Sequence, residues 1–271
     1  MRLTISHSTT YSYDSPDHYA LQQLRLRPKT GAGQRVIEWS TEISGGIKQL
    51  SYDDHHDNHV DLVVIEKDAM EITITSRGVV EVEDQMGVVG RMRGLSPMWL
   101  FESPTEVTEP GPGLRRLAKA VIGAQKTIGL EQLHHLSAAI LADVRYDKGQ
   151  TDATLVAEAA LAAGHGVCQD HAHIFITVAR LLGYPARYVS GYLLLEGQTE
   201  QEATHAWAEA WVEPLGWVGF DVSNGISPDA RYVRVATGRD YGEAAPSHGL
   251  RMGAGRETMA VRLQVAAVAA Q

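Results

Sequence analysis

Cys168 is the only cysteine among the 271 residues, and it lies in the segment GHGVCQDHAH, residues 164–173. From this cysteine to about Leu182 the apolar residues follow a helical period, and Gly183 and Pro185 then end the helix. The thiol would therefore lie in the first turn of a helix, where unpaired backbone N–H groups and the helix dipole stabilise a thiolate. A nucleophile is the first chemical hypothesis for this residue.

Two other interpretations of Cys168 make different demands on the sequence. Structural zinc sites usually pair their ligands, as in C-x₂-C with a second pair downstream, and that pattern is absent. A buried free cysteine would explain an apolar helix face. It would not explain the glycines before the cysteine or the polar Gln169 and Asp170 after it, which are candidates for capping the helix. The sequence favours the nucleophile, and we expect no metal and no cofactor.

A nucleophilic thiol needs a general base and a group that orients this base. The segment THAWAEAWVEPLGWVGFDVSNG predicts two strands joined by a turn near Pro214. His205 lies on the first strand. Asp221 ends the second strand, opposite Trp207 and diagonal to His205. Diagonal neighbours lie roughly 7–8 Å apart at Cα, which lets a carboxylate reach an imidazole nitrogen.

An oxyanion formed by attack of the thiolate needs hydrogen-bond donors. The backbone N–H of Cys168 is one candidate, because it lies at the start of the predicted helix. Tyr146 and His165 are both candidates for a second donor, and the sequence does not choose between them.

Candidates for lining a substrate pocket are Gly166, Gln169 and Trp207. Glycine lets a substrate backbone approach closely, whereas aromatic residues on alternating strand positions more often pack in a core. His171 and His173 follow on the same helix as the cysteine, and we expect them to make supporting polar contacts.

The segment DDHHDNHVD, residues 53–61, concentrates four aspartates and three histidines. Such a cluster could bind a cation. Asp and Asn are also typical turn residues, so a solvated hairpin loop explains the segment with fewer assumptions.

The elements that position these residues change in type along the chain. Residues 1–84 alternate in the period of strands and predict a small antiparallel sandwich. Residues 85–113 are rich in Gly and Pro and predict a linker. Helices and then strands follow. We expect an N-terminal β domain with its linker over residues 1–100, and a catalytic core with a C-terminal strand over residues 101–271.

Bulk composition limits the function classes. The net charge of −9 argues against a nucleic-acid partner, which would require clustered Lys and Arg. One cysteine cannot form an intrachain disulfide. No run approaches the roughly 18 apolar residues of a membrane helix, and the N-terminal residues lack the pattern of a signal peptide. We therefore expect a cytoplasmic protein without a membrane partner.

The segments GVCQDHAHIFITVARLLGYPARYVSGYL, HAWAEAWV and GWVGFDVSNG follow one another at a specific spacing. Together they resemble the bacterial transglutaminase-like superfamily over residues 110–245. YSYDSP, LRLRP and DNHVDLV resemble the β domain that precedes this core in a bacterial subgroup. The resemblance implies an α+β protein with a papain-like core.

The resemblance also implies a catalytic triad, with Cys168 as nucleophile, His205 as base and Asp221 as orienting group. The family usually has Pro-Thr after the aspartate, and this chain has Val222 and Ser223 instead. The expected function is a thiol-dependent hydrolase of peptide or protein amides that acts through a thioester. The alternatives are a transglutaminase, which passes the acyl group to an amine, and a non-catalytic binding module on the same fold.

Overall fold

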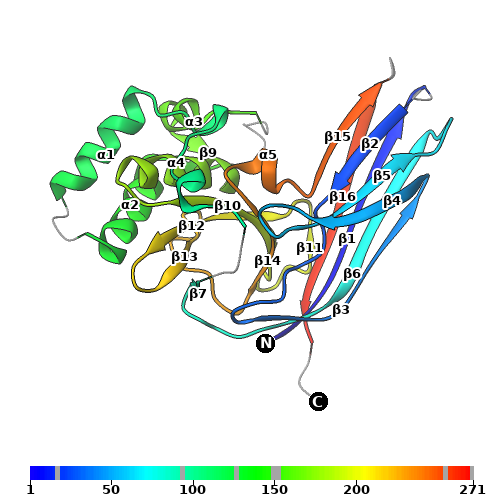
Figure 1. The fold of residues 1–271 in the computed structure, drawn as a ribbon, viewed down its shortest axis with the longest axis horizontal. Coiled ribbons are helices and arrows are strands. Elements are labelled where there is room, and N and C mark those ends of the chain that lie inside the picture. Colours follow the sequence, from blue (N-terminus) through cyan, green and yellow to red (C-terminus); the bar gives the residue numbers. More distant parts are fainter. Residues whose placement is uncertain (16–18, 92–94, 125–127, 148–153, 253–255, 269–271) are drawn as a thin grey trace.

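The computed structural model describes residues 1–15, 19–91, 95–124, 128–147, 154–252 and 256–268. Figure 1 shows two halves side by side, which we call the helical half and the sandwich half. The predicted α+β class is confirmed. No helix within the described ranges is long and apolar enough to cross a bilayer.

The sandwich half contains two antiparallel sheets, with strand orders β11-β16-β1-β6-β3 and β15-β2-β5-β4. Its strands are β1 (Arg2–Tyr13), β2 (Tyr19–Leu24), β3 (Gln34–Ser44), β4 (Gly46–Asp53), β5 (His59–Ile65), β6 (Glu71–Val82), β11 (Glu200–Gln201), β15 (Ser247–Met252) and β16 (Glu257–Ala267). Alternate residues of β1 are buried. Tyr11 and Tyr13 pack between the two sheets, whereas Leu3 and Ile5 pack against residues of the helical half. This period-two pattern is the reason that the sequence predicted strands here.

The last two strands belong to the sandwich half and not to the predicted core. β16 pairs with β1 from Leu3 opposite Ala267 to Tyr13 opposite Glu257, and β15 pairs with β2. Leu263 and Val265 are fully buried in the same apolar cluster as Leu3. The chain therefore returns to its first strands after completing the helical half, as the orange and red strands of Figure 1 show.

The helical half is built on an antiparallel sheet of order β14-β10-β12-β13-β7. Its larger elements are α1 (Pro112–Ala124), α2 (Leu130–Asp143), α3 (Ala157–Ala163), α4 (Cys168–Leu181), α5 (Tyr241–Ala244), β7 (Val88–Gly90), β10 (Ala186–Leu193), β12 (His205–Val212), β13 (Gly216–Phe220) and β14 (Tyr232–Gly238). Shorter elements are η1 (Met98–Phe101), η2 (Glu106–Thr108), β8 (Arg145–Tyr146) and β9 (His165–Gly166).

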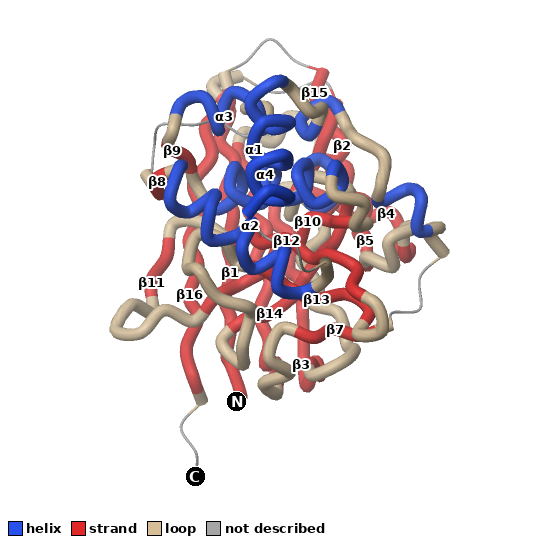
Figure 2. Tube along the Cα trace, turned by 90° about the vertical axis from the view of Figure 1, so that its left-hand side faces the viewer, coloured by secondary structure: helices blue, strands red, loops and turns tan. Residues whose placement is uncertain are grey.

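Helix α4 is the centre of the helical half. It lies on β12 and is covered by α1, α2 and α3, as Figure 2 shows from the side. Every residue from Asp170 to Ala179 is buried. A helix buried on all sides is held in place by its neighbours, so its first residue has a fixed position.

Part of the predicted linker, residues 85–113, is built into the helical half. β7 pairs with β13 at the edge of the sheet, and η2 packs on α4. A Cβ at Gly216 would lie 2.5 Å from the carbonyl carbon of Gly90. The two chain segments can approach this closely because residue 216 is glycine.

Candidate active site

Cys168 is the first residue of α4, as the sequence predicts. Gly164 ends the preceding helix with a left-handed φ of 68°, and β9 and Val167 then lead into α4. The carboxylate of Asp170 accepts the backbone N–H of Val167 at 2.8 Å, so Asp170 caps the helix. The first N–H groups of a helix have no partner within it, which leaves the N–H of Cys168 suited to an oxyanion.

Gly166 makes room for this cap and not for a substrate. A Cβ at Gly166 would lie 2.7 Å from Oδ2 of Asp170. The glycine is buried and does not belong to the described lining of the cavity beside the thiol. Gly166 therefore differs from its predicted role in the substrate pocket, because the side chain of Asp170 occupies the space next to it.

His205 and Asp221 meet as the strand register requires. Ala208 of β12 pairs with Phe220 of β13, and one further step places Trp207 opposite Asp221. The diagonal neighbour His205 has its Nε2 atom 2.6 Å from Oδ2 of Asp221. The carboxylate is fully buried.

Two further side chains hold Asp221. The Nδ2 group of Asn224 and the hydroxyl of Tyr232 each donate to Oδ2 at 2.7 Å. Burial alone would raise the pKa of Asp221, but the hydrogen bonds from His205, Asn224 and Tyr232 hold this pKa below its usual value. Neither Asn224 nor Tyr232 was predicted in this role from the sequence.

The thiol of Cys168 hydrogen bonds to the imidazole of His205. Because Nε2 of His205 faces Asp221, Nδ1 is the ring nitrogen left for the thiol. Burial lowers the pKa of His205, but the contacts with Asp221 and Cys168 outweigh it and raise this pKa to about 10. The site therefore stabilises an imidazolium between two acidic groups.

An open cavity of about 1160 Å³ lies beside these residues. Cys168, Gln169 and His205 line it together with Tyr188 and Ser190. Its lining also includes Gln198, residues 200–204 and two residues of β16, Val261 and Arg262. The sandwich half thus contributes directly to the cavity.

Of the two candidates for a second oxyanion donor, Tyr146 shares the cavity with Cys168. Burial and the nearby charges of Cys168 and Asp221 raise the pKa of Tyr146 to about 12, so its phenol keeps its proton and can donate. His165 lies outside the described lining of the cavity.

Trp207 lies beside His205 and not in the cavity lining that the structure describes. It is 3% exposed, its ring centroid lies 6.2 Å from that of His205, and it contacts Tyr232 edge-on. Trp207 therefore packs against the imidazole, in agreement with a core role for an aromatic residue at an alternating strand position.

His171 and His173 make the expected supporting contacts. Nδ1 of His171 lies 2.8 Å from the hydroxyl of Ser223, and Nε2 lies 2.9 Å from the carbonyl oxygen of Val144. His171 thus connects the helix with the turn that follows Asp221. Nε2 of His173 accepts the backbone N–H of Tyr241 at 3.1 Å.

The segment of residues 53–61 forms the predicted hairpin turn, but it is only partly solvated. His56 and Asn58 are 6% and 1% exposed, because the turn packs against the helical half. The turn also brings His55 and His56 to within 4.8 Å of Glu243, measured between their potential metal-ligand atoms. A metal could therefore be held here, away from Cys168.

Sequence comparisons agree with this arrangement. Residues 115–222 match the model of the transglutaminase-like superfamily, and residues 3–81 match the bacterial transglutaminase-like N-terminal region. The uncharacterized protein ML0607 of Mycobacterium leprae is 31% identical over 282 residues, which cover 99% of both chains. The uncharacterized protein Rv2569c of Mycobacterium tuberculosis is 28% identical, over 92% of this chain and 87% of that protein.

Among solved structures, a candidate cysteine protease from Cytophaga hutchinsonii is similar in fold. The two chains superpose with a TM-score of 0.77 at 21% identity, over 100% of this chain and 92% of the other. The likeness thus extends over both halves of the molecule. The chain belongs to the transglutaminase-like superfamily, with the bacterial N-terminal region of that family joined to its core.

Proposed function

We propose that this protein hydrolyses amide bonds of peptides or proteins through a thioester on Cys168. The observation that carries the proposal is the hydrogen-bonded series from the thiol to His205 and from His205 to Asp221, beside an open cavity. A nucleophile, a base and a group that orients the base are the parts that nucleophilic catalysis needs.

In the first half of the reaction, the Cys168 thiolate attacks the carbonyl carbon of the substrate. The carbonyl oxygen becomes an oxyanion, which the N–H of Cys168 and the phenol of Tyr146 are suited to bind. The imidazolium of His205 gives its Nδ1 proton to the amide nitrogen. The C–N bond then breaks, the amine leaves, and a thioester remains on Cys168.

In the second half, neutral His205 takes a proton from water, and the resulting hydroxide attacks the thioester carbonyl. The C–S bond breaks, and the carboxylic acid and the thiolate are released. Asp221 stabilises the charged imidazole in both halves without accepting its proton. The likeness in fold to the candidate cysteine protease supports water as the acceptor of the acyl group.

The volume and the lining of the cavity support a peptide or protein substrate. Its volume of about 1160 Å³ exceeds the roughly 300–1,000 Å³ that small-molecule sites usually have. Its lining includes apolar side chains, such as Leu193 and Leu195, and polar side chains, such as Gln198 and Gln201. A peptide presents both kinds of surface.

The rival functions differ in what happens to the thioester. A transglutaminase would pass the acyl group to a primary amine, and a binding module would form no thioester. The purified protein should therefore be mixed with an activated acyl substrate and followed by intact mass, with and without a primary amine. The proposal predicts one adduct on wild type, none on Cys168→Ala, and free acid as the main product when the amine is present.

Each other outcome of this experiment contradicts a stated part of the proposal. An adduct that persists in Cys168→Ala would remove the cysteine from the mechanism. Amide as the main product at modest amine concentration would favour the transglutaminase. The absence of any adduct with a library of peptide acyl donors would favour the binding module.

A further inference from the structure

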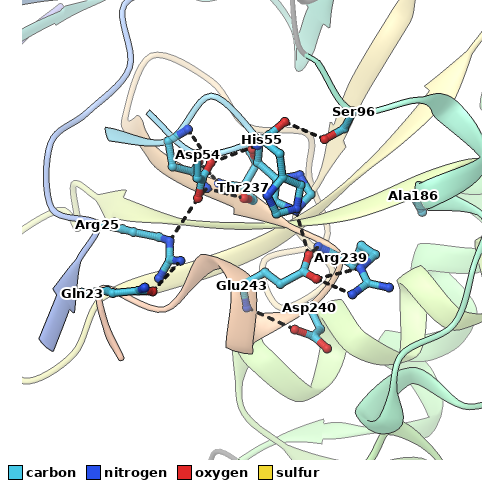
Figure 3. Close-up of polar contacts among 12 residues, drawn as sticks. Gln23, Arg25, Asp54, His55, Ser96, Ala186, Thr237, Arg239, Asp240 and Glu243 are labelled. Carbon is cyan, nitrogen blue, oxygen red and sulfur yellow. Dashed lines mark hydrogen bonds and ion pairs between the residues drawn. The ribbon is translucent and has the colours of Figure 1, made fainter. Parts of the chain in front are cut away.

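The turn between β4 and β5 connects the two halves of the molecule, as Figure 3 shows. The side chain of Asn58 donates to the carbonyl oxygen of Thr237 at 2.8 Å and accepts the N–H of Thr237 at 2.8 Å. The Nζ group of Lys29 donates to the carbonyl oxygen of His56 at 2.7 Å. These bonds hold the turn against β14 and Lys29.

Three potential metal ligands converge at this junction. Nε2 of His56 lies 2.8 Å from Oε2 of Glu243, and the imidazole of His55 completes a group whose ligand atoms lie within 4.8 Å of one another. Two imidazoles and a carboxylate are a ligand set typical of zinc. Tetrahedral zinc, with bonds of roughly 2.0–2.1 Å, places its ligands about 3.3 Å apart. His55 is exposed, so its side chain can rotate to close the remaining gap.

His56 also has a ring nitrogen without a partner. The side chain of His56 is 1% exposed, and its Nδ1 atom has no hydrogen-bond partner among the residues that the structure describes. A buried polar atom without a partner is unfavourable. A metal ion bound at Nδ1 would supply the missing interaction.

Arg239 holds the carboxylate of Glu243 in place. The Nε group of Arg239 donates to Oε1 at 2.7 Å, and the backbone N–H of Arg239 donates to Oε2 at 2.8 Å. His56 also bonds to Oε2, so both oxygens of the carboxylate are held in a fixed orientation. Such outer contacts orient a carboxylate ligand in metal sites.

We propose that His55, His56 and Glu243 form a binding site for a divalent transition-metal ion of the zinc type. The ion would join the β4–β5 turn of the sandwich half to α5 of the helical half. Helix α5 contributes Tyr241 to the cavity beside Cys168, and the carbonyl oxygen of Ala244 accepts the hydroxyl of Ser190, another cavity residue. The metal would therefore brace one wall of the cavity without contacting the thiol.

The test uses the full chain with Cys168→Ala as the background, because a thiol beside a histidine can itself bind zinc. Zn²⁺ binding is measured by calorimetry, and Co²⁺ replaces Zn²⁺ for absorption spectra. The proposal predicts one Zn²⁺ per chain and a thermal midpoint that rises with Zn²⁺. Adding His55→Ala should weaken binding at least about tenfold, as should adding Glu243→Gln in a separate protein. Adding His248→Ala, a matched exposed histidine on β15, should leave binding unchanged.

His55 is exposed, so His55→Ala should keep the fold even where a change at the buried His56 would not. Failure of the Cys168→Ala protein to bind Zn²⁺ would overturn the proposal and leave His56 and Glu243 as a hydrogen-bonded pair. Zn²⁺ binding of equal strength in the His55→Ala and Glu243→Gln proteins would also overturn it. Neither result depends on hydrolytic activity, so the proposed function is tested separately.

Discussion

Nε2 of His205 lies 2.6 Å from Oδ2 of Asp221, so the carboxylate binds one ring nitrogen and leaves Nδ1 for the thiol of Cys168. In neutral His205 this contact keeps the proton on Nε2. Nδ1 then carries the lone pair that can accept a proton from the thiol or from water. The tautomer of His205, and therefore its use as a base, depends on Asp221.

Asp221→Asn should lower kcat by about 10⁴-fold on a peptide-amide substrate, because the amide favours the wrong tautomer of His205. Asn224 and Tyr232 both donate to Oδ2 of Asp221. An amide NH₂ in place of this oxygen would face the two donors and could not accept their hydrogen bonds. Steady-state kinetics measures the effect. Asp229→Asn is the control, because Asp229 pairs with Arg231 and should leave kcat unchanged. A kcat for Asp221→Asn within tenfold of wild type would contradict this assignment.

Tyr232→Phe should lower kcat by about tenfold with little change in KM. The hydroxyl donates to Oδ2 of Asp221 at 2.7 Å, and a hydrogen bond to a charged group contributes roughly 1.5–3 kcal/mol. Only part of this energy bears on the orientation of His205. Tyr192→Phe, which loses a contact with His7, is the matched control and should keep kcat. If both variants have the kcat of wild type, Tyr232 does not position Asp221.

The sequence permitted prediction of the contact between His205 and Asp221, because its geometry is local. The helical period predicted a helix that begins near Cys168, and the period of two placed Asp221 opposite Trp207. Tyr232 could not be predicted in the same way. It reaches Asp221 from β14, on the other side of β10 and β12, and no periodicity specifies which strand lies beside which.

Several features of the fold could not be predicted from the sequence, each for a physical reason. The residues of β4 from Ile47 to Asp53 are exposed and lack the apolar alternation of the other N-terminal strands, so periodicity does not identify this strand. The turn at residues 53–61 was expected to be solvated, because its polar composition does not reveal that Asn58 bonds to Thr237, 179 residues away. The pairing of β16 with β1 likewise joins the two ends of the chain.

Glu209→Gln should destabilise the fold by about 3–5 kcal/mol, measured by urea unfolding. Glu209 is fully buried on β12, and it pairs with Arg187 at 2.6 Å and with Arg234 at 2.7 Å. Loss of the carboxylate leaves two buried guanidinium groups without their anion. Glu81→Gln is the control: Glu81 pairs with two exposed arginines, and surface pairs contribute little. Equal unfolding midpoints for the two variants would refute the prediction.

Stability should fall as the pH drops from 6.5 to 4, in part because of His7. Burial lowers the pKa of His7 to about 4, whereas the unfolded chain keeps a pKa near 6.5. Between these values the unfolded state binds a proton that the folded state does not, so the stability present above pH 6.5 is lost as the pH falls. The loss is about 3 kcal/mol once the pH is below 4.

His7→Gln should flatten this dependence, and His135→Gln, at an exposed position of α2, should not. Urea unfolding at pH 7 and at pH 4.5 gives the comparison. Parallel pH profiles for wild type and His7→Gln would show that His7 does not contribute.

Alkylation of Cys168 by iodoacetamide should be at least about tenfold faster at pH 6 in wild type than in His205→Ala. The thiolate is the reactive form, and a neighbouring imidazolium stabilises it, whereas a free cysteine ionises near pH 8.5. The raised pKa of His205 means that the imidazolium is present throughout the neutral range. Its effect is lost as the pH rises through about 10, so the two rates should converge there. His135→Ala, an exposed histidine, should follow wild type at every pH. Superimposed profiles for wild type and His205→Ala from pH 5 to pH 9 would mean that the two side chains do not act as a pair.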